Sequence, residues 1–123
     1  MNILIVDDHT GYIESLKSIV SYAFEDVKNL EITKSLNCEN AIQTIKHRVA
    51  INKTFDLAII DYIMPSYTEE EINNGGDLYT YLKKVMPSCK TIINTGILED
   101  FTLFEIDQKN KTRCLNFKKR FKC

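Results

Sequence analysis

The chain has 123 residues, of which 44% are hydrophobic and 27% charged, and its formal net charge is −1. This length and composition fit one globular domain with its own core, which we expect to cover residues 1–123, and they exclude a disordered chain, a collagen-like repeat and a two-domain enzyme. The charge is unevenly distributed, because residues 1–108 carry 9 basic and 17 acidic groups whereas residues 109–123 carry seven basic and no acidic groups.

The sequence predicts neither export nor membrane insertion. No apolar run approaches the roughly 20 residues that span a bilayer, and the first residues lack the basic start and small-residue cleavage site of a signal peptide. We therefore expect a cytoplasmic protein. The two histidines are too few for a histidine-based metal site. The four cysteines lack zinc-site spacing, so we expect reduced thiols at Cys38, Cys89, Cys114 and Cys123.

The first half of the chain predicts two strand–helix units. Asn2–Val6 is a continuous apolar run rich in β-branched residues, which is typical of a strand covered on both faces. Apolar residues at helical spacing predict a helix over Tyr12–Ala23. A weaker strand signal at Glu31–Leu36 precedes a predicted helix at Asn37–Arg48, which Asn37 is suited to cap.

The middle of the chain predicts a third unit with a long connection. Phe55–Ile60 is the third predicted strand, and Asp61 ends it. Ser66–Asn74 contains three consecutive glutamates and is expected to form a polar loop that Gly75–Gly76 ends. A helix is then predicted over Leu78–Met86.

The last third predicts two further strands and one helix. The strands are Cys89–Asn94 and Arg113–Lys118, and the helix between them covers Leu98–Asp107. Because apolar strands alternate with helices throughout, we expect parallel βαβ units in an α/β three-layer sandwich with a five-stranded parallel sheet.

Polar side chains follow four of the five predicted strands. They are Asp7, Asp8, Asp61, Thr95, Lys118 and Lys119. Each has an ordinary explanation when taken singly, such as a helix cap for an aspartate or a local hydrogen bond for a threonine. The carboxyl ends of parallel strands, however, meet at one edge of a sheet, which is also where such folds bind ligands. We therefore expect these groups to converge.

The expected group of side chains suits phosphoryl transfer. Three crowded carboxylates repel one another and are stable as anions only beside a cation, and Mg²⁺ accepts one or two carboxylates while keeping several waters. A carboxylate can act as the nucleophile that takes a phosphoryl group. A lysine, a threonine hydroxyl and Mg²⁺ would then neutralise and orient the phosphoryl oxygens. The sequence thus predicts an acyl-phosphate site.

Four segments of the sequence together resemble the receiver domains of two-component response regulators, and the resemblance covers nearly the whole chain. The segments that carry the resemblance are Ile3–Asp8, Asp56–Asp61 followed by Met64–Pro65, Ile92–Gly96, and Lys119–Phe121. The resemblance implies a flavodoxin-like sheet with strand order 2-1-3-4-5. It also implies a cytoplasmic phosphoprotein of signal transduction or a phosphorelay, which takes part in its own phosphorylation and dephosphorylation and is not otherwise an enzyme.

The resemblance also implies the roles of individual residues. Asp61 would accept a phosphoryl group from a phosphohistidine of a sensor histidine kinase or phosphotransfer protein. Asp8 and Asp61 would bind Mg²⁺ with the backbone carbonyl of Ile63, and Asp7 would act largely through water. Thr95 would hold phosphoryl oxygens together with a lysine of the last strand.

The sequence departs from the receiver pattern around that lysine. Arg120 stands where the family usually has proline, so either Lys119 or Lys118 could point into the site, and the strand pleat favours Lys119. The family often has an aromatic residue three positions earlier, which is Asn116 or Leu115 here. The output mechanism of the family is therefore in question.

Two further departures concern length. The segment between Pro65 and Gly76 is about seven residues longer than in the family, and a solvated loop is favoured over a partner-specific or metal-access element because loops tolerate insertion. The family's fifth helix has no residues after Cys123, so the predicted fold lacks it. We expect either a partner or a second copy in a homodimer to cover the apolar face left open, unless the chain is part of a longer protein.

The sequence is also compatible, to different degrees, with other functions. A receiver-like interaction module that works without phosphorylation is the main alternative. A phosphatase is disfavoured because Ile63 occupies the place of a second catalytic aspartate. A flavin-binding flavodoxin is disfavoured because the loop after the first strand is acidic. The seven cations of residues 109–123 would support at most non-specific nucleic-acid binding.

Overall fold

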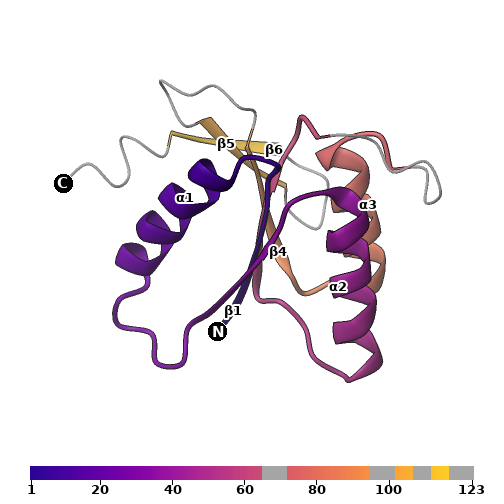
Figure 1. Ribbon diagram of the computed structural model, residues 1–123, viewed down its shortest axis with the longest axis horizontal. Helices are drawn as coiled ribbons and strands as arrows, with labels where there is room; N and C mark the ends of the chain where they lie inside the picture. The colour runs from indigo at the N-terminus through magenta and orange to yellow at the C-terminus, as the bar shows by residue number, and fades with distance from the viewer. Residues whose placement is uncertain (65–71, 95–101, 107–111, 117–123) are drawn as a thin grey trace.

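The predicted parallel strands form the centre of the computed structural model, which describes residues 1–64, 72–94, 102–106 and 112–116, the last two ranges as backbone strands (Figure 1). The elements in chain order are β1 (Asn2–Val6), α1 (Thr10–Ala23), β2 (Glu31–Ser35), α2 (Cys38–Ala50), β3 (Leu57–Asp61), α3 (Gly75–Val85), β4 (Lys90–Asn94), β5 (Thr102–Ile106) and β6 (Thr112–Asn116).

The described strands form one sheet in the order β2-β1-β3-β4-β5-β6. The first four pair in parallel, which confirms the predicted α/β sandwich with a parallel sheet and the 2-1-3-4 part of the predicted order. The prediction of five parallel strands is wrong, because β5 and β6 join the sheet as antiparallel strands.

The helix predicted over Leu98–Asp107 is also wrong, since Thr102–Ile106 is strand β5. A short apolar run does not distinguish helix from strand by periodicity, and the residues Thr-Leu-Phe-Glu-Ile are mostly β-favouring types. A short connection suffices between antiparallel neighbours, whereas a parallel neighbour needs a crossover of a dozen or more residues. Residues 107–111 are therefore enough to lead from β5 into β6, in place of the predicted parallel strand Arg113–Lys118.

The helices pack on both faces of the sheet and give the predicted three layers (Figure 1). On one face α2 and α3 bury residues such as Ile45 and Leu82 against alternate residues of β1 and β3. On the other face α1 buries Ile13, Leu16 and Val20 against the intervening residues. The central strands β1 and β3 are thus covered twice, which explains their continuous apolar sequences.

Helix α3 begins earlier than predicted. Asn74 is its N-cap, and its side-chain oxygen accepts a hydrogen bond from the backbone N–H of Asp77 at 3.0 Å. The Asp77 carboxylate in turn accepts one from the backbone N–H of Asn73 at 2.8 Å. Gly75 and Gly76 therefore form the first turn of the helix and do not end the loop. Ile72, which the prediction placed in a polar loop, is buried in the core.

We expect the Asn74→Ala substitution to lower the free energy of unfolding by about 1 kcal/mol, because it removes the N-cap acceptor. The matched control is Asn73→Ala, which keeps the backbone N–H that donates to Asp77. Urea unfolding of both variants tests this, and an equal loss of stability in the two would contradict the assigned cap.

Other predictions concern residues that the structure describes only in part. Cys38 and Cys89 are buried free thiols, as predicted. In the part of the chain that the structure describes, no helix is long and apolar enough to cross a membrane. Residues 66–71 of the long connection, and residues 117–123, where the fifth helix was expected to be missing, lie outside the described residues.

Candidate functional site

Asp7 and Asp8 follow β1 directly at the carboxyl edge of the sheet, by which we mean the edge formed by the carboxyl ends of β1, β3 and β4. The side chain of Asp7 is only 3% exposed, whereas that of Asp8 is 33% exposed. Neither residue caps α1, because the N-cap is His9, whose own side chain makes no capping hydrogen bond. The ordinary structural explanation for aspartates at this position therefore does not apply.

Asp61 is the last residue of β3 and is 7% exposed. Its Oδ1 accepts a hydrogen bond from the backbone N–H of Ile63 at 3.3 Å, which closes a local turn after β3. It does not cap the following helix either, since Asn74 does so. Ile63 therefore lies in the same turn as the Asp61 carboxylate.

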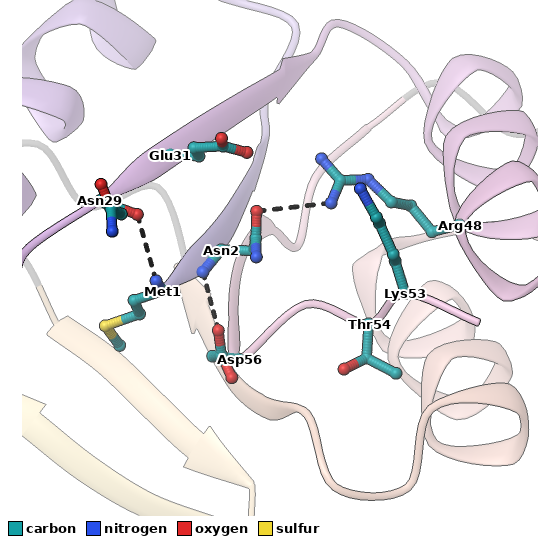
Figure 2. Close-up of a pocket in the computed structure, with 8 residues that line it drawn as sticks. All are labelled: Met1, Asn2, Asn29, Glu31, Arg48, Lys53, Thr54 and Asp56. Carbon is teal, nitrogen blue, oxygen red and sulfur yellow. Dashed lines mark hydrogen bonds between the residues drawn. The ribbon is translucent and has the colours of Figure 1, made fainter. Parts of the chain in front are cut away.

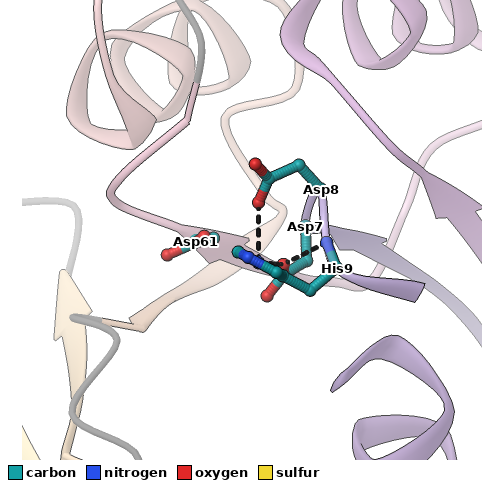
Figure 3. A group of neighbouring side chains, drawn as sticks. All are labelled: Asp7, Asp8, His9 and Asp61. Carbon is teal, nitrogen blue, oxygen red and sulfur yellow. Dashed lines mark hydrogen bonds and ion pairs between the residues drawn. The ribbon is translucent and has the colours of Figure 1, made fainter. Parts of the chain in front are cut away.

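The three carboxylates come together with a fourth group that sequence reasoning left out. One ligand atom from each of Asp7, Asp8, His9 and Asp61 lies within 4.8 Å of the others. Figure 3 shows the His9 imidazole reaching both neighbouring carboxylates, with Asp61 beside them. The Nδ1 atom of His9 lies 2.9 Å from Asp8 Oδ1 and 3.2 Å from Asp7 Oδ1. The adjacency of His9 to two aspartates was the signal in the sequence that could have indicated its place.

The electrostatics of the site disfavour unpaired negative charge. Burial, followed by the nearby charge of Asp7, raises the pKa of Asp61 to about 6. Burial also raises the pKa of Asp7, although its hydrogen bonds with His9 oppose that shift. The hydrogen bond with Asp7, and then the charge of Asp8, raise the pKa of His9. The carboxylates of Asp7 and Asp8 therefore favour the protonated, positively charged form of His9.

The residues present fit a divalent cation of the Mg²⁺ type. We call Asp7, Asp8 and Asp61 the acidic cluster. Its members offer hard carboxylate oxygens within 4.8 Å of one another, and two of the three are buried where charge is costly without a cation. The charge of such an ion would offset the burial and the charge repulsion that raise the pKa values of Asp7 and Asp61.

Gly75 allows α3 to approach the strand that carries Asp61. Its backbone N–H donates to the carbonyl of Tyr62 at 2.9 Å. A Cβ atom at position 75 would lie 2.8 Å from Tyr62 Cα and would also collide with the backbone carbonyl of Asp61. Only glycine fits there, so Gly75 allows the end of β3 and the start of α3 to lie in direct contact.

A second contact joins the end of β4 to α1. Asn94 is 1% exposed, and its side-chain amide donates to the hydroxyl of Tyr12. The backbone carbonyl of Asn94 accepts from the N–H of Tyr62 at 2.8 Å. Burial raises the pKa of Tyr12 to about 12, so the hydroxyl remains neutral at physiological pH. This hydrogen bond ties the end of β4, which leads to Thr95, to α1. No local pattern in the sequence indicates it.

The remaining predicted site residues, Thr95, Lys118 and Lys119, lie outside the described residues. The strand that leads to the lysines is β6, which runs in the same direction as β4 because two antiparallel pairings separate them. It therefore also ends toward the carboxyl edge of the sheet. Its distance from β4 is about 10 Å, two strand spacings, instead of the single spacing that the five-stranded prediction implied.

A pocket of about 400 Å³ lies at the opposite, amino edge of the sheet (Figure 2). Its residues are Met1, Asn2, Asn29, Glu31, Arg48, Lys53, Thr54 and Asp56. Several of its polar groups bind one another: Asp56 accepts from the backbone N–H of Asn2 at 2.7 Å, and Arg48 contacts the Asn2 side chain at 3.4 Å. It is separate from the acidic cluster, which lies beyond the other ends of the same strands.

Comparison with solved structures identifies the fold. A response regulator receiver domain protein from Clostridium thermocellum matches with a TM-score of 0.58 at 20% identity, covering 80% of this chain and 68% of that one. The Salmonella typhimurium RcsB response regulator matches with a TM-score of 0.55 at 20% identity. That structure concerns the conformational dynamism of RcsB for DNA interaction. That match covers 76% of this chain but only 39% of RcsB. No protein-family model and no curated protein matches the sequence.

The chain therefore has the α/β, flavodoxin-like fold of response regulator receiver domains, and the resemblance noted in the sequence is confirmed at the level of the fold. Its sheet differs from the predicted arrangement after β4, where the last two strands are antiparallel.

Proposed function

We propose that the chain, as a single domain over residues 1–123, is a phospho-acceptor signalling domain that takes a phosphoryl group onto Asp61 in a Mg²⁺-dependent reaction. The donor is a phosphohistidine of a sensor histidine kinase or phosphotransfer protein. The observation that carries the proposal is the buried Asp61 carboxylate at the end of β3, within 4.8 Å of the other members of the acidic cluster, none of which caps a helix. The buried free thiols accord with the reducing cytoplasm, where we place the domain.

The proposed reaction needs an ionised, positioned carboxylate. An Asp61 oxygen forms a bond to phosphorus while the phosphorus–nitrogen bond of the phosphohistidine breaks and its electron pair returns to the imidazole, which takes up a proton. With its pKa at about 6, Asp61 is largely ionised at pH 7 and above. The hydrogen bond from the Ile63 N–H holds Oδ1 and leaves Oδ2 as the attacking atom.

Metal binding falls to Asp8, Asp61 and the Ile63 carbonyl in this proposal, with Asp7 acting largely through water. When bound, Mg²⁺ supplies charge neutralisation for the phosphoryl oxygens. Thr95 and Lys119 hold the same oxygens. The domain relays the signal through changed protein contacts and is a reactant, not a catalyst acting on a separate substrate.

The test is labelling with acetyl phosphate, followed by intact mass. We expect a gain of one phosphoryl group in Mg²⁺, no gain after chelation, and none in Asp61→Asn. The control Asp26→Asn, at an exposed position far from the acidic cluster, should label normally. Absence of labelling of the parent chain in saturating Mg²⁺ would overturn the proposal.

We expect Lys119→Ala to slow labelling by about 100-fold, because it removes a positive group from the developing phosphoryl charge. Lys118→Ala is the matched control, because neighbouring residues of an extended chain point in opposite directions, and it should change the rate by less than about threefold. Rates from quenched time courses decide between them. The reverse result would assign the role to Lys118 instead of Lys119. Normal rates in both variants would show that neither lysine contributes to the site.

A receiver-like interaction module that works without phosphorylation is the second candidate. It is favoured by the apolar side chains of Tyr62 and Ile63, which are 44% and 69% exposed beside the acidic cluster, and by Asn116 in place of an aromatic residue. Partner binding measured with and without phosphodonor separates the two functions. Equal affinity in both conditions would favour the module.

A further inference from the structure

We propose that His9 is a nitrogen ligand of the divalent ion bound by the acidic cluster. Its imidazole makes this site prefer Mn²⁺, and other transition ions that bind nitrogen ligands, over Mg²⁺. The inference rests on the proposed function, since it takes the acidic cluster to be a metal site. It goes further by adding a side chain to the ligand set and by naming the class of ion.

The position of the imidazole supports this role. Its Nδ1 lies within hydrogen-bonding distance of one oxygen of Asp7 and one of Asp8, and it shares the 4.8 Å sphere with Asp61. Ligands on opposite sides of an ion with bonds of 2.0–2.2 Å are about 4 Å apart. Small side-chain rotations would therefore bring the Asp8, His9 and Asp61 atoms onto one ion, with Asp7 reaching that ion through a water.

The backbone holds His9 at the site, and its ring pairs with Asp7 and Asp8 without capping α1. The His9 backbone N–H donates to Asp7 Oδ1 at 2.9 Å, so the residue is held beside the carboxylate. Its side chain makes no capping hydrogen bond to α1 and is 74% exposed, so the ring neither begins the helix nor fills the core. The surrounding solvent leaves room for the waters that a divalent ion keeps.

The donor set determines the preferred ion. Mg²⁺ favours oxygen ligands only, whereas imidazole suits first-row transition ions, whose affinity rises from Mn²⁺ toward Cu²⁺. The carboxylates of Asp8 and Asp61, the Ile63 carbonyl and one imidazole form a mixed oxygen and nitrogen set, which Mn²⁺ accepts. The imidazole binds an ion only in its neutral form with no proton on Nδ1, so binding of the ion through His9 strengthens as the pH rises.

The decisive experiment uses Mn²⁺ as a paramagnetic probe at pH 8. Pulsed electron paramagnetic resonance detects the nitrogen coupling of an imidazole bound directly to Mn²⁺. The chain has only two histidines, and His47 lies exposed on α2 away from the cluster. We expect the coupling in the parent chain and in His47→Asn, and we expect its loss in His9→Asn.

Calorimetric titration with Mn²⁺ and with Mg²⁺ gives the second readout. His9→Asn should lower the ratio of Mn²⁺ to Mg²⁺ affinity by about tenfold or more, as lost metal-site interactions commonly do. His47→Asn should leave the ratio unchanged. Because the His9 ring is mostly exposed, the variant should keep the parent's thermal unfolding temperature.

The outcomes separate the two proposals. If both ions bind the parent chain and Asp61→Asn weakens them, but no imidazole coupling appears and His9→Asn leaves the ratio unchanged, this inference is wrong and the proposed function stands. If neither ion binds the parent chain, the metal dependence of the proposed function fails, and this inference fails with it.

Discussion

Replacing Gly75 with alanine lowers the free energy of unfolding by about 2–3 kcal/mol and slows labelling at Asp61. The added Cβ would collide with the backbone of Asp61 and Tyr62, including Tyr62 Cα at 2.8 Å, and backbone atoms cannot rotate away. Overpacking of this kind typically costs 1–3 kcal/mol, and the alternative is for α3 to move away from β3. Either response disturbs the turn that holds the Asp61 carboxylate.

Gly11→Ala is the matched control for this prediction. Gly11 lies in α1, and a Cβ there would meet nothing within 4 Å. Because Gly11 lies in the first turn of α1, the same substitution should raise stability by less than the roughly 1 kcal/mol gained in a helix interior, and it should not lower stability. Guanidinium unfolding of both variants gives the comparison. A stabilised Gly75→Ala variant with normal labelling would contradict the close approach of α3 to β3.

Asp61→Asn makes the protein more stable at pH 7.5 in the absence of divalent ions, by about 2 kcal/mol. Burial and the charge of Asp7 raise the pKa of Asp61 to about 6, against an ordinary value near 4 in the unfolded chain. Between pH 4 and 6 the folded state binds more protons than the unfolded state, so the parent chain loses stability as the pH rises through this range. The amide carries no such penalty.

The gain in Asp61→Asn should therefore be small near pH 4 and complete above pH 6. Urea unfolding from pH 4 to 8 in a chelating buffer measures it, with Asp26→Asn as an exposed control that should follow the parent curve. Mg²⁺ should reverse the order by stabilising the parent chain more than the variant, because it binds the folded site. If the variant is less stable than the parent chain at pH 7.5 without metal, ionisation of Asp61 does not destabilise the folded state and this prediction is wrong.

The sequence was most informative where a strand is covered on both faces. The predicted strands Asn2–Val6 and Phe55–Ile60, each with four consecutive apolar residues, correspond closely to β1 and β3, because burial on two faces leaves few alternatives. It was least informative after β4. There, a five-residue apolar segment fits either a helix or a strand, and whether β5 pairs in parallel or antiparallel depends on contacts between distant residues.

The candidate site shows the same division. Asp7, Asp8 and Asp61 could be placed together because the carboxyl ends of parallel strands share one edge, which requires only the fold class. The place of His9, the Tyr12–Asn94 hydrogen bond and the close approach of Gly75 depend on side-chain directions and helix position, which a local pattern does not specify.

The central claim is that Asp61 is the residue that carries the phosphoryl group, and chemical trapping tests it most directly. Borohydride reduces an aspartyl phosphate to homoserine, so the chain is incubated with acetyl phosphate and Mg²⁺, reduced, digested and analysed by peptide mass spectrometry. We predict conversion at Asp61 alone and its absence without Mg²⁺. Conversion at Asp7 or Asp8 instead, or no conversion at any aspartate, would contradict the account.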